Sequence, residues 1–343
     1  MNKEIIIKLL SEIKYPGFSR DIISFGILKN IHISENEVVL ELSANTDNNQ
    51  IIESIIKNIN EKFNNLNSNF NLKIDFQANK EANPSGDIDK PLSNIKNIIA
   101  VASGKGGVGK STVSINLAAS LSRDWKVGIL DLDIYGPSLP MIAGSFEQPQ
   151  LTEDQKLIPI KKFNMELMSF GFINNDNNAT IWRGPMVARL TQQFFNDVVW
   201  GDLDYLIIDL PPGTGDIQLT LVQKLQLTGA VIVTTPQDLS LLDAKKAADM
   251  FSKVNTKILG IIENMSDFSC PNCDHVTKIF PGEGVVDESN RLNIPILGKI
   301  SIIPELAKSM DNGSPYIIDN PDSYLSKKYQ EISNQINTIV NKG

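Results

Sequence analysis

The sequence predicts an α/β protein in which a mostly parallel sheet, with helices on both faces, follows a small α+β domain. From residue 97 onward, short apolar runs of strand length alternate with longer segments of helical periodicity, the pattern of a parallel sheet covered on both faces. Residues 1–77 hold a separate set of shorter strand and helix patterns. Between these sets, residues 78–96 are polar, contain prolines and a glycine and lack periodicity, which is typical of a linker. We therefore expect one domain at 1–77 and another at 97–343.

The composition of the 343 residues bounds the class of protein. A hydrophobic content of 41% and a charged content of 21% are those of a globular protein. The net charge of −8 disfavours nucleic acid as a partner. No apolar run is long enough to span a membrane and the first residues lack the apolar core of a signal peptide, so we expect no membrane association. The chain has two cysteines, which excludes a disulfide scaffold and favours a cytoplasmic location.

The first domain is expected to contain two helices and three strands. In the second helical segment, isoleucines recur three and four residues apart, whereas the last strand segment alternates apolar and polar residues. The first two strands flank a short polar turn and predict a hairpin. The helices are expected at residues 5–13 and 51–63, and the strands at 27–33, 38–42 and 72–76.

The second domain opens with a short apolar strand at 97–103, a glycine-rich loop and a helix from about Lys110 to Arg123. The loop fits G-x-x-x-x-G-K-[ST], the phosphate-binding P-loop, which makes this a P-loop NTPase domain. Its glycines allow positive φ and let backbone N–H groups surround phosphates, and the helix N-terminus adds positive partial charge. Lys110 would lie along the β- and γ-phosphates of ATP, and the Ser111 hydroxyl would hold Mg²⁺. The predicted nucleotide-binding residues are Gly104, Lys105, Gly106, Gly107, Val108, Gly109, Lys110, Ser111 and Thr112.

The rest of the second domain continues the alternation of strands and helices. The apolar runs are short and bounded by polar residues, as expected for buried strands of a parallel sheet. The C-terminal segment carries one apolar stripe at helical spacing, which favours a closing helix packed on the core over a helix at a membrane surface. Further strands are expected at residues 126–133, 205–209, 229–235, 257–262 and 296–300, and helices at about 239–254 and 323–340.

Lys105, the second residue of the loop, sets this P-loop apart from simpler ones. With it the segment resembles the deviant P-loop class, G-K-G-G-x-G-K-[ST]. The resemblance implies that Lys105 crosses a dimer interface and touches the nucleotide of the partner. A second cation near the transferring phosphoryl group would offset charge that develops in the transition state. We therefore take Lys105 and Lys110 as catalytic candidates; the alternative for Lys105 is a solvated surface lysine.

Carboxylates end two of the expected strands. Four apolar residues followed by Asp209 form a Walker-B-like strand end, and a carboxylate at this edge of a parallel sheet would face the P-loop and hold Mg²⁺, usually through water. Asp131 and Asp133 lie two residues apart and so on one side of their strand. By resemblance to deviant P-loop proteins, Asp133 is the candidate for positioning the attacking water, and Asp131 for supporting the metal shell. The alternative is a pair of solvated strand-end carboxylates.

Cys270 and Cys273 form a C-x-x-C pair, which could be a redox dithiol, half a zinc site or half a cluster site. Zinc and [4Fe–4S] centres ordinarily take four ligands. His275 could add a third ligand, but His32, the other histidine, belongs to the first domain. Two chains related by a two-fold axis would supply four thiolates, which favour an iron–sulfur cluster or zinc. A shared metal site is the favoured interpretation; a redox pair or an idle pair remains open.

Several motifs in order resemble the Mrp/ApbC-type iron–sulfur cluster carrier ATPases. They are the P-loop, residues 131–138, 182–186, 209–216 and 263–266, and the Cys-Pro-Asn-Cys segment, and together they cover about residues 95–315. The first domain resembles the small domain in front of the ATPase in many of these carriers, but lacks the cysteine that some relatives have. The stretch 282–286 also departs from a more glycine-rich family pattern.

The resemblance implies a homodimer that binds ATP and Mg²⁺, hydrolyses ATP slowly, holds a labile cluster between its subunits and delivers it to apo iron–sulfur proteins. The cluster would be [4Fe–4S], bound by Cys270 and Cys273 of both chains. The resemblance also suggests that the Asn264 amide reads adenine. Two alternatives stay open: a positioning ATPase of the partition or division-site type, and a zinc-bridged dimeric ATPase without cluster transfer. The recipients, the cluster type, the step that ATP drives and the task of the first domain are not fixed by the sequence.

Overall fold

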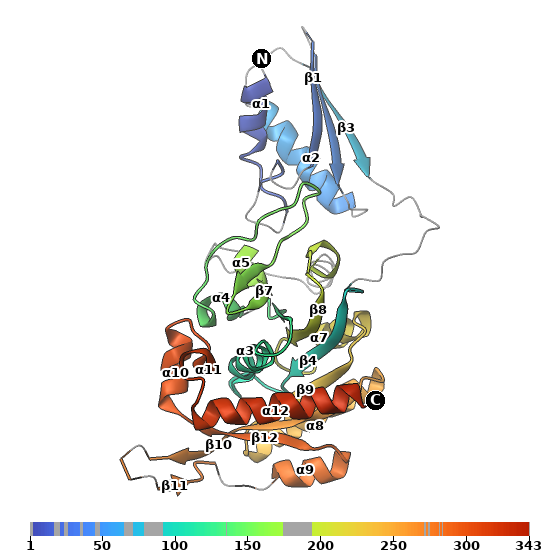
Figure 1. The fold of residues 1–343 in the computed structure, drawn as a ribbon. Coiled ribbons are helices and arrows are strands. Elements are labelled where there is room, and N and C mark those ends of the chain that lie inside the picture. Colours follow the sequence, from blue (N-terminus) through green and yellow to red (C-terminus); the bar gives the residue numbers. More distant parts are fainter. Residues whose placement is uncertain are drawn as a thin grey trace. The chain divides into compact units, whose positions relative to one another are not determined.

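The computed structural model contains two compact units, one drawn chiefly from Met1–Asp89 and the other from Lys90–Thr152, Lys156–Ile173 and Ile181–Gly343 (Figure 1). The expected linker at 78–96 falls largely outside the described part of the chain, so the domain boundaries stay a prediction. The structure describes residues 3–16, 21–23, 27–34, 37–44, 49–64, 71–78, 92–134, 136–173, 194–270, 272–273, 275–280, 282 and 284–342.

The described residues of the first unit form a three-stranded sheet with two helices. The strands run in the order β1-β2-β3, with β1 and β2 antiparallel and β2 and β3 parallel. The apolar stripe of the second helix is buried at Ile55 and Ile59, so this helix contributes to the core of the unit. The small α+β domain is therefore confirmed. Its elements are α1 (Lys3–Leu10), β1 (Leu28–Ile33), β2 (Glu37–Ala44), α2 (Asn49–Asn64) and β3 (Asn71–Ala78).

The second unit is built on a mostly parallel sheet with strand order β11-β10-β9-β4-β8-β5-β7-β6, and β12 pairs with β10. The pairs of β10 with β11 and of β6 with β7 are antiparallel, and the others are parallel. The strands are β4 (Ile95–Ala102), β5 (Val127–Asp131), β6 (Ile160–Lys162), β7 (Met165–Ser169), β8 (Leu203–Asp209), β9 (Gly229–Thr234), β10 (Ile258–Ser269), β11 (Val276–Thr277) and β12 (Ile296–Ile302).

Helices cover both faces of this sheet, as alternation along β9 shows. Val231 and Val233 belong to the core cluster beneath the first and last helices of the unit, whereas Ile232 packs with Leu241 and Ala248 on the other face. The predicted α/β class is confirmed. The helices are α3 (Lys110–Leu121), α4 (Leu139–Ile142), α5 (Phe170–Ile173), α7 (Asp216–Lys224), α8 (Asp238–Lys253), α9 (Gly284–Leu292), α10 (Pro304–Asp311), α11 (Tyr316–Asp319) and α12 (Tyr324–Asn341).

The C-terminal helix α12 lies along the helix α3 and the strand β12 (Figure 1). Its apolar stripe is buried in the same cluster as α3, so the interpretation as a closing helix is confirmed. Ser323 caps its first turn by accepting a hydrogen bond from the Ser326 backbone N–H at 3.1 Å. Within the described ranges, no helix combines the length and apolar character needed to cross a bilayer. The buried residues of the α12 stripe are Leu325, Tyr329, Ile332 and Ile336.

Strand β10 differs from the expectation. The sequence predicts a strand that stops at residue 262, whereas β10 runs on to Ser269 and ends one residue before Cys270. The added residues, 263–269, mix polar and apolar side chains and are partly exposed. They therefore lack the apolar run by which the sequence identifies the buried part of the strand. Pairing with β12 on one side and with β11 near its end supplies the hydrogen bonds that hold it. One strand of the sheet therefore leads directly to the cysteine pair.

Candidate functional site

The glycine-rich loop lies between β4 and α3, where the sequence predicts the P-loop. Gly107 and Gly109 both have φ of +81°, a conformation that residues with a Cβ rarely adopt. A Cβ on Gly109 would lie 2.3 Å from the Asn264 amide nitrogen, and one on Gly104 would lie 2.2 Å from the backbone of Asp243 in α8. Glycine is therefore required for conformation at Gly107 and Gly109 and for packing at Gly104 and Gly109. The resulting loop ends at the N-terminus of α3, where its backbone N–H groups suit a phosphate.

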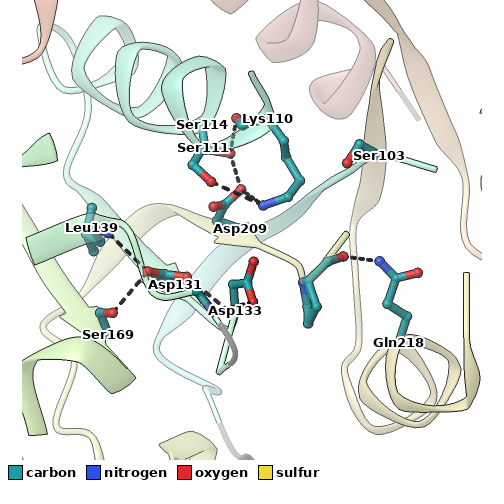
Figure 2. Close-up of polar contacts among 12 residues, drawn as sticks. Ser103, Lys110, Ser111, Ser114, Asp131, Asp133, Leu139, Ser169, Asp209 and Gln218 are labelled. Atoms are coloured by element: carbon teal, nitrogen blue, oxygen red, sulfur yellow. Dashed lines mark hydrogen bonds and ion pairs between the residues drawn. The ribbon is translucent and has the colours of Figure 1, made fainter. Parts of the chain in front are cut away.

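Lys110 and Asp209 form a buried ion pair at the base of the loop (Figure 2). The Lys110 Nζ lies 2.7 Å from Asp209 Oδ1, and the two side chains are 6% and 3% exposed. The Ser114 hydroxyl donates to the same oxygen at 2.7 Å. Nζ also lies 3.3 Å from the Ser111 hydroxyl oxygen. The structure thus brings together the three residues predicted for phosphate and Mg²⁺, and it adds Ser114, which the motif does not mark.

Asp131 ends β5 beside Asp209 of β8, its partner in the strand register. One carboxylate oxygen accepts from the Asp133 backbone N–H at 3.0 Å. The other accepts from the Leu139 backbone N–H at 3.1 Å and from the Ser169 hydroxyl at 3.0 Å (Figure 2). Asp131 therefore fixes both ends of the loop that carries Asp133. Its expected part in the metal shell stays a prediction.

Asp133 is half-buried and lies beyond the end of β5. One of its carboxylate oxygens accepts from the Gly136 backbone N–H at 3.1 Å, which restricts the side chain to its own loop. Figure 2 shows Asp133 near the Asp209 end of the site, below the Lys110 ion pair. The candidate role in positioning water is compatible with this placement and stays a prediction.

The pKa of Asp131 provides a test of its burial. Burial, and then the charge of Asp209, raise the pKa of Asp131 to about 7. The pKa of an aspartate in the unfolded chain is about 4. Between about pH 4 and 7 the folded chain therefore holds a proton that the unfolded chain has lost. This contribution to folding stability is present at the acid end and is lost as the pH rises.

Replacing Asp131 by asparagine removes this proton. The free energy of unfolding of Asp131→Asn, taken relative to the unsubstituted protein, is expected to rise by about 2 kcal/mol or more from about pH 4.5 to about pH 7. Urea unfolding in a metal chelator at several pH values measures it. A difference between the two proteins that stays flat with pH would contradict the buried, proton-binding carboxyl.

The Lys105 side chain contacts a residue of its own chain. Its Nζ lies 3.3 Å from the Gln237 side-chain oxygen, immediately before α8, and its backbone carbonyl accepts from the Ser103 hydroxyl at 2.9 Å. Gln237 was not marked by any motif, because its contact depends on the packing of α8 beside the P-loop. The predicted reach of Lys105 to a partner's nucleotide stays a prediction.

Asn264 also lies at the P-loop. It is a buried residue of β10, and its side-chain amide donates to the Val108 backbone carbonyl at 2.8 Å. The amide nitrogen thus supports the loop. Whether this residue reads adenine stays a prediction.

The two cysteines lie at the far end of β10. Strands β10 and β11 pair through Phe268 with Thr277 and Ser269 with Val276, and the Cys270 backbone N–H donates to the His275 carbonyl at 3.0 Å. The cysteines therefore sit on the turn of a hairpin.

The turn favours the thiolate form. Backbone hydrogen bonding by Asn272, and then the Cys273 thiol, lower the pKa of Cys270. Cys270 is half-buried and Cys273 is exposed. In the described ranges, no group of three or more histidine, cysteine, aspartate or glutamate residues is placed to hold a metal ion. The pair therefore offers two soft ligands at the surface and, among described residues, no third beside them.

Residues 94–337 match the family model described as ParA: NUBPL iron-transfer P-loop NTPase. The chain belongs to this family. The match includes the P-loop, both strand-end carboxylate sites and the cysteine pair. The family resemblance drawn from the motifs is confirmed, although the motif at 182–186 lies outside the described residues.

Curated relatives carry the name iron-sulfur cluster carrier protein. The one from Helicobacter pylori is 36% identical over 350 residues, which cover 100% of this chain and 94% of that protein. The one from Pseudomonas fragi is 47% identical over 245 residues, covering 71% of this chain and 85% of that protein. The first of these alignments extends the similarity beyond the NUBPL-family match to the N-terminal unit.

Solved structures share the fold. A nucleotide-binding protein from Archaeoglobus fulgidus in complex with ADP is 39% identical, with a TM-score of 0.60 over 67% of this chain and 91% of that one. The cell division ATPase MinD of Pyrococcus furiosus is 23% identical, with a TM-score of 0.52 over 71% of this chain and 99% of that one. At this identity the second likeness concerns the fold alone. The predicted P-loop NTPase fold is confirmed.

Proposed function

We propose that this NUBPL-family chain is an ATP-dependent iron–sulfur cluster carrier. It works as a cytoplasmic homodimer, binds a labile cluster between its subunits and transfers it to apo iron–sulfur proteins. The observation that carries the proposal is the cysteine pair on the β10–β11 hairpin, with Cys270 half-buried and Cys273 exposed, in a chain that also holds a P-loop. The names of the curated relatives support the same cargo.

The nucleotide half of the proposal rests on the P-loop. Its left-handed glycines and the adjacent helix N-terminus fit phosphates, and Ser111 and Asp209 supply the hard oxygen ligands that Mg²⁺ prefers. Bound Mg²⁺ would offset the charge that develops on the phosphates of ATP during hydrolysis. Lys110 would contact the phosphates, Asp133 would orient water, and Lys105 would act across the dimer.

The cluster half rests on ligand number. Two thiols of one chain provide half of a four-thiolate set, so a second chain supplies the rest about a two-fold axis. Because Cys273 is exposed, its thiol can join a cluster that a second chain also binds. This exposure also leaves the cluster close to solvent, as delivery to another protein requires. We propose a [4Fe–4S] cluster on this basis.

Anaerobic purification followed by iron, sulfide and zinc analysis tests the proposal. About four iron and four sulfide per dimer are expected after reconstitution, together with transfer of the cluster to an apo ferredoxin. Stoichiometric zinc without an iron chromophore would instead identify a zinc-bridged dimer. Iron retained in full by a monomer would overturn the shared site.

A further inference from the structure

The phosphate loop and the cysteine pair are joined by one strand, β10. Asn264, within this strand, holds the P-loop through the Val108 carbonyl at 2.8 Å. Cys270 follows the strand's last residue, six positions after Asn264 in the sequence. The P-loop, β10 and Cys270 all belong to the same compact unit. A displacement of the P-loop can therefore reach the thiols along a short segment of one strand.

The Met265 side chain also lies beside the loop end of this path. A Cβ on Gly109 would lie 3.9 Å from the Met265 methyl carbon and 2.3 Å from the Asn264 amide nitrogen. Gly109 is the residue that precedes α3 and Lys110. Two successive residues of β10 thus lie beside Gly109, in the part of the loop where a phosphate would bind.

The strand is irregular between its two ends. Met265 has a φ of +57°, and of the non-glycine residues with positive φ in the described ranges it alone lies within a strand. In the pairing of β10 with β12, Asn264 pairs with Ile300 and the next pair is Phe268 with Ile302. Four steps along β10 therefore match two along β12, which is a bulge. Such a bulge disrupts the ladder locally and bends the strand, and the left-handed methionine in it is a strained backbone conformation.

We infer that Asn264 and Met265 are positioning residues that couple the phosphate loop to the cysteine pair, so that nucleotide bound to a chain changes the exposure of the thiols of the same chain. Beyond the bulge, Phe268 and Ser269 pair with β11, so a displacement of β10 moves the base of the cysteine turn. The meaning of this coupling for cluster delivery rests on the proposed function. The coupling itself requires only the nucleotide, the loop and the strand.

Alkylation of the thiols measures the coupling without a cluster. Full-length protein, stripped of metal and reduced, reacts with limiting iodoacetamide with and without saturating Mg-ADP, and mass spectrometry follows Cys270 and Cys273. The rate for at least one thiol is expected to change by about fivefold or more on ADP binding, the usual size of coupling between sites. Met265→Gly removes the side chain beside Gly109 and frees the backbone of the bulge. Asn264→Ala removes the hydrogen bond to Val108.

In both variants, with ADP kept well above the dissociation constant measured for each, the thiol rates are expected to be the same with and without nucleotide. Lys299→Ala is the matched control, because it removes an ion pair between β12 and Glu263 of β10 at 3.2 Å but touches neither the loop nor the bulge. It is expected to keep the full response to ADP.

Three results would overturn the inference: thiol rates in the unsubstituted protein that ignore ADP, a full response in Met265→Gly with ADP bound, or a response that appears only as protein concentration brings chains together. Failure of the proposed function is a separate result, because it is read from iron and sulfide content. A protein that binds no cluster but shows the ADP-dependent rates keeps this inference and loses that function.

Discussion

Replacing Cys270 or Cys273 by alanine is expected to lower the iron and sulfide bound per dimer at least about tenfold, because even the loss of an outer-shell partner costs a metal site 10- to 100-fold. Each substitution removes two ligands from a shared four-thiolate set, one from each chain. The described residues near the hairpin include no third ligand in place to substitute. Iron and sulfide assays after anaerobic reconstitution measure the effect.

Ser269→Ala is the matched control for the cysteine variants. Ser269 is exposed and is the neighbour of Cys270, at the end of β10. Its substitution is expected to leave iron content unchanged. ADP affinity should also be unchanged in both cysteine variants, because the P-loop contacts lie at the other end of the strand. Full iron content in Cys273→Ala would contradict the shared site, since an exposed thiol that is not a ligand is dispensable.

Lys110→Ala is expected to abolish nucleotide binding and to lower the free energy of unfolding by about 3–5 kcal/mol, the usual result of removing one partner of a buried ion pair. Asp209, at 3% exposure, would be left charged with the Ser114 hydroxyl as its remaining partner among the contacts described. Calorimetric titration with Mg-ADP measures binding, and urea unfolding measures stability. Retained ADP binding in the variant would contradict the P-loop assignment.

Lys96→Ala provides a matched control, because its partner Asp204 lies on β8, the strand that ends with Asp209. Lys96 of β4 pairs with Asp204 of β8 at 2.7 Å, the same distance as the Lys110 pair, but its side chain is 75% exposed. Exposed pairs contribute little to stability, so this variant should be nearly as stable as the unsubstituted protein and should bind ADP normally. The double variant Lys110→Ala with Asp209→Asn is expected to recover part of the lost stability and none of the binding.

The fold and the nucleotide loop could be predicted because their signals are local. Strand-length apolar runs and helical stripes identify the parallel sheet, and the spacing of Gly109, Lys110 and Ser111 identifies the loop without any knowledge of the rest of the chain. Asp209 follows from the topology, because parallel strands end at one edge of the sheet. These residues are held by backbone geometry that their own sequence specifies.

The supporting contacts could not be predicted, because they join residues far apart in the sequence. Gln237 meets Lys105 only once α8 is packed beside the loop, and Ser169 reaches Asp131 only through the pairing of β5 with β7. The full length of β10 was missed for a related reason. Its outer part is polar, partly exposed and bulged, so neither an apolar run nor strict alternation marks it.

The position of α12 bears on how the protein is made. This helix covers α3, the helix that begins with Lys110, and Tyr205 of β8 donates to its Asn337 at 2.6 Å. During synthesis the P-loop leaves the ribosome long before α12 does. Until α12 follows, the apolar side of α3 that it covers stays exposed on the nascent chain. We expect chaperones to recognise this surface, and the P-loop unit to close only after α12 has left the ribosome.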